Sequence, residues 1–329
     1  MSTQSRHSSE QSPAKPHLSA LATGLSHGKI ILMGEHSVVY SYPAIAVPFA
    51  AAEITAQVTP AQYDTVSIDC PYIVGPMPDW PDHLDNLKAA ILLSFETMKR
   101  PVEPLHLVIS STIPVERGMG SSAAVAVAII RALNAYYQED LDDQALYFIA
   151  NQAEVIAHGS TSGIDTLMCS NDQPIIYAKG KETHWYHLNL DAYLIVADTG
   201  LKGQTKLAVE GVAQLKAEAP DRVQKIMENI GQIVRQAKLA IDRKDAVQLG
   251  RLMTYNQYHL NQLGVSNETI DRLVNAAWLA GALGAKLTGG GLGGCVIALA
   301  DTPQSADQVA QAMEAAGADQ TWIQHLLDL

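Results

Sequence analysis

The stretch GMGSSAAVAVAII, residues 118–130, places two glycines and two serines directly before an unbroken apolar run. Because the run is apolar on every side, it predicts a buried helix. The first backbone N–H groups of a helix lack intrahelical partners, and together with the helix dipole they favour an anion. Gly118 and Gly120 remove side chains that would keep a phosphate away, and Ser121 or Ser122 could cap the helix. The alternative is a tight turn that only lets the helix pack closely.

This glycine pattern matches one of two common phosphate-binding motifs. The P-loop pattern G-x-x-x-x-G-K-[S/T] is absent, whereas GMGSSA matches G-x-G-x-x-A between a predicted strand and a helix, as in dinucleotide folds. However, the acids about twenty residues further on, in QEDLDD, fall between two predicted helices and not after a second parallel strand. A mononucleotide phosphate is therefore favoured. A second pattern, GGGLGG at residues 289–294, leads into the strand CVIALA and not into a helix. It therefore cannot be a Rossmann turn, although it can be a loop that lies close to a ligand.

The composition excludes several classes of partner. Apolar residues make up 47% and charged residues 17% of the 329 residues, a balance typical of globular proteins. The net charge is −12 and no Lys/Arg cluster stands out, so we expect no nucleic acid and no membrane surface as a partner. The three cysteines are far apart and lack metal-ligand spacing, which predicts reduced thiols and a cytoplasmic location. No run is long enough to span a membrane, and the polar residues 1–20 predict a flexible tail without a secretory signal.

The remainder of the chain changes in texture near Leu188, where we expect a domain boundary. The elements expected before it are strands beginning at Lys29 and Leu105, one or two strands in residues 43–60, and helices ending near Tyr137 and His158. After it we expect the strand AYLIVAD, mostly helix from residue 202 to about 283, a strand–loop–strand unit around GGGLGG, and a helix from about Gln304.

Two acids follow the predicted phosphate loop along the chain. Glu154 flanks the apolar face of the second helix, and Asp165 lies in the polar segment after that helix. Taken singly, Glu154 is typical of a solvated helix side and Asp165 of a turn former. Beside a phosphate loop, one acid could hold Mg²⁺ and the other could accept a proton from an attacking hydroxyl.

Three separate segments together resemble a known superfamily. They are SHGKIILMGEHSVVYSYPAIAVP at residues 26–48, GMGSSAA at 118–124 and KLTGGGLGGC at 286–295. In order and spacing they are similar to the three motifs of the galactokinase, homoserine kinase, mevalonate kinase and phosphomevalonate kinase (GHMP) superfamily. GEHSVVY and IAHGSTSGID resemble its mevalonate kinase branch, because galactokinases carry Thr-Asp-Tyr after GEH and phosphomevalonate kinases carry Gly-Glu-Tyr. Two departures are His27, where many relatives have proline, and Leu292 within GGGLGG.

The resemblance implies an α+β fold of two domains with the active site between them. Residues 21–188 would form a domain like the second domain of ribosomal protein S5, and residues 189–329 a ferredoxin-like domain. The implied reaction moves the γ-phosphoryl group of ATP to the C5 hydroxyl of mevalonate with the help of Mg²⁺. A homodimer is an expectation at the level of the family.

The resemblance also assigns roles to residues. Asp165 would be the catalytic base, and Lys29 would lie near it and stabilise charge on the transferring group. Ser122 and Glu154 would bind Mg²⁺. The nucleotide would contact Gly118, Met119, Gly120, Ser121, Ser122, Ala123, Gly289, Gly290 and Gly291, and the substrate would contact Glu35, His36 and Thr288.

Other functions stay open from the sequence. Within the same class the alternative is another GHMP kinase, such as a phosphomevalonate kinase. Alternatives of a different class are a dinucleotide-dependent oxidoreductase and a non-catalytic sensor on a kinase fold. A sensor is expected to lack part of the catalytic set, yet Lys29, Glu154 and Asp165 are all present.

Overall fold

The computed structural model describes residues 21–159, 161, 163–327 and 329, so the predicted tail at residues 1–20 lies outside the described residues. The first half of the chain builds one mixed sheet, in the order β4-β3-β5-β2-β6-β7 with β1 paired to β2. Its strands are β1 (Ala22–Met33), β2 (Ala44–Pro60), β3 (Ser67–Cys70), β4 (Ile73–Pro76), β5 (Leu105–Ser111), β6 (Ile175–Tyr177) and β7 (His184–Trp185). Among the described residues, β3 with β5 is the one parallel pair of this sheet. A dinucleotide fold requires a helix that connects two adjacent parallel strands, and the helix after β5 does not do so.

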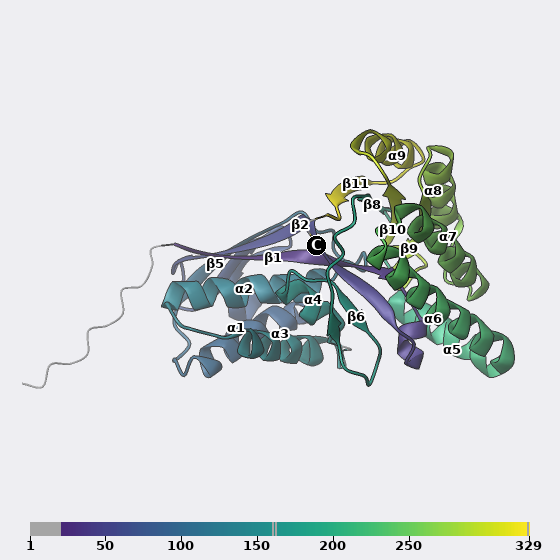
Figure 1. The fold of residues 1–329 in the computed structure, drawn as a ribbon. Helices are drawn as coiled ribbons and strands as arrows, with labels where there is room; N and C mark the ends of the chain where they lie inside the picture. The colour runs from purple at the N-terminus through teal and green to yellow at the C-terminus, as the bar shows by residue number, and fades with distance from the viewer. Residues whose placement is uncertain (1–20, 160, 162, 328) are drawn as a thin grey trace, which may run out of the picture.

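Four helices cover one face of this sheet (Figure 1): α1 (Asp85–Thr97), α2 (Ser121–Tyr137), α3 (Asp143–His158) and α4 (Ile164–Ser170). Short 3₁₀ helices are η1 (Ser37–Tyr40), η2 (Met77–Asp79) and η3 (Asp82–Leu84). Helix α2 lies directly on β1, because a Cβ at Gly24 would fall 2.1 Å from the carbonyl oxygen of Ala128 and 2.4 Å from the amide nitrogen of Ala132. Only glycine allows this backbone contact, which fixes the position of α2 and hence of its N-terminus.

The second half builds an antiparallel sheet in the order β11-β8-β10-β9. Its strands are β8 (Tyr193–Asp198), β9 (Gly284–Thr288), β10 (Cys295–Ala300) and β11 (Gln320–His325). The helices of this half are α5 (Thr205–Glu218), α6 (Pro220–Asp242), α7 (Ala246–Gln262), α8 (Glu268–Leu279) and α9 (Pro303–Ala315). None of the described helices is long and apolar enough to cross a membrane.

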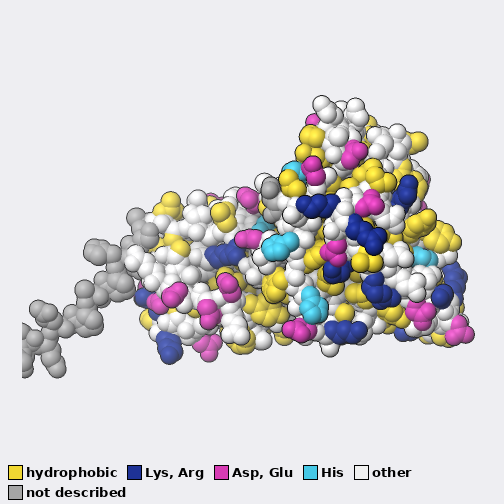
Figure 2. All heavy atoms as spheres, in the orientation of Figure 1, with side chains coloured by type: hydrophobic (Ala, Val, Ile, Leu, Met, Phe, Trp, Pro, Cys, Tyr) yellow, Lys and Arg dark blue, Asp and Glu magenta, His cyan; other side chains and the backbone are white. Residues whose placement is uncertain are grey.

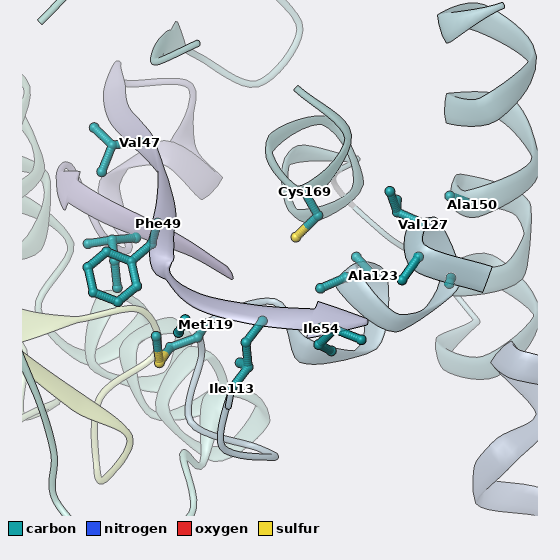
Figure 3. Packing of buried hydrophobic residues seen from close by; sticks show 14 of the residues in the cluster. Val47, Phe49, Ile54, Ile113, Met119, Ala123, Val127, Ala150 and Cys169 are labelled. Carbon is teal, nitrogen blue, oxygen red and sulfur yellow. The ribbon is translucent and has the colours of Figure 1, made fainter. Parts of the chain in front are cut away.

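The largest apolar core is shared between the two halves of the chain. Met119, from the loop before α2, belongs to the same buried cluster as Phe49 and Ile54 of β2 (Figure 3). Val196 of β8 and Ile297 of β10 belong to it as well. Neighbouring residues along β8 and β10 point to the other face of the second sheet and join a separate core with α5–α9. The second sheet is therefore buried on both faces.

The structure confirms several predicted elements and corrects others. The helix ending at Tyr137, the mostly helical region from residue 202 and the strand–loop–strand unit are confirmed. Strand β1 begins at Ala22, earlier than the predicted start at Lys29, because residues 22–28 continue the pairing with β2. The polar segment before Asp165 leads into helix α4, which was not predicted. The expected domain boundary at Leu188 falls between β7 and β8 and stays a prediction.

Candidate active site

The predicted phosphate loop and the second glycine loop lie side by side. A Cβ at Gly289 would fall 3.7 Å from the Cα atom of Gly118. The amide of Lys29 donates a hydrogen bond to the carbonyl oxygen of Met119, with a distance of 2.9 Å, so β1 is attached to the loop before α2. The three segments identified in the sequence, although far apart along the chain, therefore meet at one place.

Among the contacts given for the described residues, no side chain caps the N-terminus of α2. Gly120 occupies the N-cap position with a φ of 74°. The prediction that Ser121 or Ser122 caps the helix is therefore wrong. A Cβ at Gly120 would lie 3.1 Å from Cγ of Lys29 and 3.2 Å from Sγ of Cys169, so only glycine fits this position without displacing them. The helix end keeps backbone N–H groups that can bind an anion next to the Lys29 side chain.

Ser122 turns away from the cap position because a partner on another helix binds its hydroxyl. Ser122 Oγ donates to Glu154 Oε1 of α3 over 2.5 Å, and it accepts a hydrogen bond from Asn86 Nδ2 of α1 over 2.8 Å. Glu154 is buried, which removes the interpretation of this acid as a solvated helix residue. A buried carboxylate that contacts a hydroxyl offers two hard oxygen donors beside the anion-binding end of α2.

This donor set fits Mg²⁺ better than it fits a transition metal. Magnesium in nucleotide sites is held by one or two carboxylates together with substrate phosphates and water. Within the described part of the chain, no three His, Cys, Asp or Glu side chains cluster as a complete metal cage. A cation held by Ser122 and Glu154 would therefore keep coordination positions for phosphate oxygens.

The resemblance to the superfamily predicted that Lys29 lies near Asp165, and the two side chains form an ion pair. Lys29 Nζ lies 2.9 Å from Asp165 Oδ1, and 5% of the Lys29 side chain and 42% of the Asp165 side chain are exposed. Asp165 sits in the first turn of α4, after Gly163 at the N-cap position. The carboxylate can therefore be reached from outside, while the lysine is enclosed. Burial raises the pKa of the neighbouring Cys169 thiol, so this cysteine is no candidate nucleophile.

Glu35, predicted to contact a substrate, is fully buried and bound to groups of the second half. Its carboxylate forms an ion pair with Lys286 of β9 and accepts a hydrogen bond from Asn256 Nδ2 of α7 over 3.2 Å. Burial raises the pKa of Glu35 and lowers that of Lys286. The predicted substrate contact of Glu35 stays a prediction, and it would require the carboxylate to exchange one of these protein partners.

His36 and Thr288 also join the two halves. His36 Nε2 lies 2.8 Å from the carbonyl oxygen of Gly290 and must carry the proton, because a carbonyl only accepts. Burial lowers the pKa of His36, which favours this neutral form. Thr288 Oγ1 donates to the carbonyl oxygen of Ile31 over 2.9 Å. Their predicted substrate contacts stay predictions.

The sequence analysis did not identify several residues that lie at the candidate active site. Lys286 belongs to the quoted motif KLTGGGLGGC, and a lysine in a buried strand was a signal that could have identified it. Arg117 directly precedes the phosphate loop. Asn86 and Asn256 had no signal, since each meets its partner only through the tertiary fold.

The face of the molecule shown in Figure 2 carries charges of both signs. Acidic and basic side chains are interspersed over it, without a broad basic area. An anionic ligand would therefore be attracted by local groups, such as Lys29 and the N-terminus of α2, and not by a field over the whole surface.

Comparisons with known proteins agree with this arrangement. Residues 86–172 match the family model of the GHMP kinases N terminal domain, and residues 237–319 match that of the GHMP kinases C terminal. The chain is 37% identical over 309 residues to a mevalonate kinase of Thermococcus onnurineus, which covers 88% of this chain and 91% of the relative. It is 36% identical over 310 residues to a mevalonate kinase of Pyrococcus furiosus, with the same coverage.

Solved structures of the same superfamily share the fold. The L. major mevalonate kinase in complex with R-mevalonate superposes with a TM-score of 0.80 and 28% identity, covering 92% of this chain and 94% of that chain. A mevalonate kinase from methicillin-resistant Staphylococcus aureus superposes with a TM-score of 0.74 and 33% identity, covering 94% and 99%. A Streptococcus pneumoniae phosphomevalonate kinase, at 15% identity and a TM-score of 0.73, covers 94% and 100% and shares the fold alone. With its two sheets and its three converging motifs, this chain belongs to the GHMP kinase superfamily, in the mevalonate kinase branch.

Proposed function

We propose that this chain transfers the γ-phosphoryl group of ATP to the C5 hydroxyl of mevalonate, giving ADP and 5-phosphomevalonate. The observation that carries the proposal is the 2.9 Å contact of Lys29 with Asp165 beside the uncapped N-terminus of α2. Phosphoryl transfer requires mainly in-line positioning of the reactants and stabilisation of charge. One acid, one enclosed cation and a set of backbone N–H donors supply these requirements, and the relatives named mevalonate kinase support the choice of substrate.

The nucleotide would bind along the two adjacent loops. Backbone N–H groups of residues 118–123 and 289–291 would hold the phosphates of ATP, with the helix dipole of α2 aiding the triphosphate. Ser122 and Glu154 would hold Mg²⁺, which would neutralise negative charge on the phosphates.

The reacting hydroxyl would be placed next to Asp165. This carboxylate would accept the hydroxyl proton while the oxygen bonds to the γ-phosphorus and the bond from that phosphorus to ADP breaks. Its exposed fraction of 42% leaves it accessible to a small alcohol. Lys29 would hold the carboxylate in place, and because the lysine is enclosed, its charge acts on the transferring group with little screening by water.

The substrate would lie where β1 meets β9. The proposed substrate contacts are Glu35, His36 and Thr288. Each would contact the substrate by giving up a hydrogen bond that it now makes to the protein, or through another of its polar atoms. As inferences from the family, the chain would act in the cytoplasm and as a homodimer. Static light scattering of the purified chain tests the second of these.

An ADP-release assay with mevalonate, phosphomevalonate, galactose and homoserine as separate acceptors tests the proposal. We expect release with mevalonate and ATP, and little with the other three. Release only with phosphomevalonate would assign the chain to that kinase, and release with none of the four would overturn the proposal.

The assay has a matched control just beyond α4, the helix that carries Asp165. Asp165→Asn should abolish release, whereas Asp172→Asn should retain it. Asp172 pairs with His27 of β1 over 3.2 Å, much as Asp165 pairs with Lys29, but 90% of its side chain is exposed. Equal loss in the two variants would contradict a specific role for Asp165.

A further inference from the structure

Arg117, the residue directly before the phosphate loop, is bound to the other half of the molecule. Its Nε donates to Oδ1 of Asp198 over 2.7 Å, and 15% of the Arg117 side chain and 3% of the Asp198 side chain are exposed. Asp198 is the last residue of β8 in the second sheet. A charge-assisted hydrogen bond therefore joins the loop of one sheet to a strand end of the other.

The surrounding contacts leave the Arg117 side chain no free nitrogen. Its Nη1 donates to the carbonyl oxygen of Val115 and its Nη2 to that of Gly200, each over 3.3 Å. The same Oδ1 of Asp198 accepts the amide of Gly200 over 2.9 Å. All three guanidinium nitrogens thus donate to protein oxygens, and Nη1 and Nη2 each keep a second N–H.

A backbone contact beside the pair holds the same segment. The carbonyl oxygen of Glu116 accepts the amide of Gly203 over 2.7 Å. Arg117 is therefore attached through its side chain, and Glu116 through its backbone, to the end of β8 and the turn that follows it.

We propose that the Arg117–Asp198 pair is a positioning device that keeps the phosphate loop in its nucleotide-binding conformation. The inference rests on the proposed function and extends it to two residues to which that function gives no role. Gly118 and Gly120 both have positive φ values, and glycines in a free loop lose more conformational entropy on ordering than other residues. A loop that is already fixed at its entrance loses less on binding, which strengthens nucleotide affinity.

A double-mutant cycle on nucleotide binding tests the proposal. The full chain would be titrated calorimetrically with a non-hydrolysable ATP analogue in the presence of Mg²⁺. Arg117→Met and Asp198→Asn should each weaken binding roughly ten- to a hundred-fold, and the double variant should be no weaker than the worse single variant. Mevalonate affinity should stay within about twofold, because no proposed mevalonate contact involves the pair.

Two outcomes would overturn the proposal. If Arg117 contacts phosphate itself, Asp198→Asn should free the guanidinium and retain or tighten binding, while Arg117→Met weakens it. The second outcome that would overturn the proposal is unchanged nucleotide binding in both single variants. Arg117→Lys, which keeps the charge but loses the fork of donors, should weaken binding as well. If Asp198→Asn does not fold, unchanged nucleotide binding in Arg117→Lys overturns the proposal.

The Arg100–Glu139 pair provides the matched control. Arg100 Nε lies 2.7 Å from Glu139 Oε1, with 22% and 32% of the side chains exposed, and Glu139 follows the opposite end of α2. Arg100→Met should lower the melting temperature without changing nucleotide affinity. If it weakens binding as much as Arg117→Met, general destabilisation explains both results and the positioning role is wrong. A wild-type chain that binds no nucleotide would instead refute the proposed function itself.

Discussion

Replacing Lys286 by methionine would leave the carboxylate of Glu35 without its cation in a place that water does not reach. Neither side chain has any exposed area, and Asn256 would remain as the partner of the carboxylate. Removing one member of a buried ion pair costs about 3–5 kcal/mol of unfolding free energy. At about 2–4 °C per kcal/mol for domains somewhat smaller than this chain, the melting temperature should fall by on the order of 10 °C.

The effect should depend on pH in a defined direction. Burial raises the pKa of Glu35 above its ordinary value of 4.5, so the folded state binds more protons there than the unfolded state. The stability contribution of such a group is complete below pH 4.5 and is lost as the pH rises through the folded-state pKa. Without Lys286, which lowers the folded-state pKa of Glu35, the loss continues to a higher pH. The loss of unfolding free energy in Lys286→Met relative to wild type should therefore be larger at about pH 8 than at about pH 5. Urea and thermal unfolding at these two pH values measure the difference.

Two further variants make the measurement decisive. Glu35→Gln combined with Lys286→Met removes both charges and keeps an acceptor for Asn256, so most of the lost stability should return. Lys238→Met breaks an exposed contact of 2.7 Å with Asp242 and should cost no more than about 1 kcal/mol. A Lys286→Met variant that melts as wild type does, or whose deficit grows as the pH falls, would refute the reasoning.

Three other predictions address the site. Asp165→Asn should lower kcat by several powers of ten, about 4 kcal/mol or more, with nucleotide binding largely kept in a titration; turnover within about tenfold of wild type would remove Asp165 from the role of base. Glu154→Gln should raise the Mg²⁺ concentration for half-maximal rate and change the KM for mevalonate much less, whereas an unchanged metal titration would contradict a ligand role. His36→Asn should raise the KM for mevalonate roughly tenfold or more while the KM for ATP moves little, and equal changes in both would argue against a substrate contact. Burial lowers the pKa of His36 from 6.5, so its contribution to stability is present above pH 6.5 and is lost as the pH falls through the folded-state pKa. In urea unfolding at decreasing pH, wild type should therefore lose more unfolding free energy than His36→Asn.

Local patterns predicted the parts of the site that depend on local structure. The apolar run after Gly120 is sufficient to predict α2, because helix formation and burial follow from neighbouring residues. The likeness of three distant motifs to one superfamily placed Lys29, the phosphate loop and Asp165 together, which their individual patterns could not do. The contact of Lys29 with Asp165 agrees with that expectation.

Contacts between distant segments account for what the sequence could not predict. A serine after glycine at a helix start is typical of a cap, but Ser122 bonds Glu154 from another helix, and a tertiary partner overrides a local preference. Glu35 and Lys286 are 251 positions apart, so no window of sequence contains both. The short helix α4 was not predicted, because the polar residues before Asp165 are typical of a loop.

The core shared by the two halves has a consequence for how the chain acquires its structure during synthesis. Trp322, in β11 near the end of the described chain, belongs to the same buried cluster as Phe49. Gln324, in the same strand, donates to the carbonyl oxygen of Pro48 over 3.1 Å and accepts the amide of Ala51. A ribosome adds Gln324 276 positions after Pro48, so a nascent chain carries an incomplete largest core until β11 has been synthesised. Contacts of such long sequence separation form slowly, and the exposed apolar face of β2 is then a natural target for chaperones.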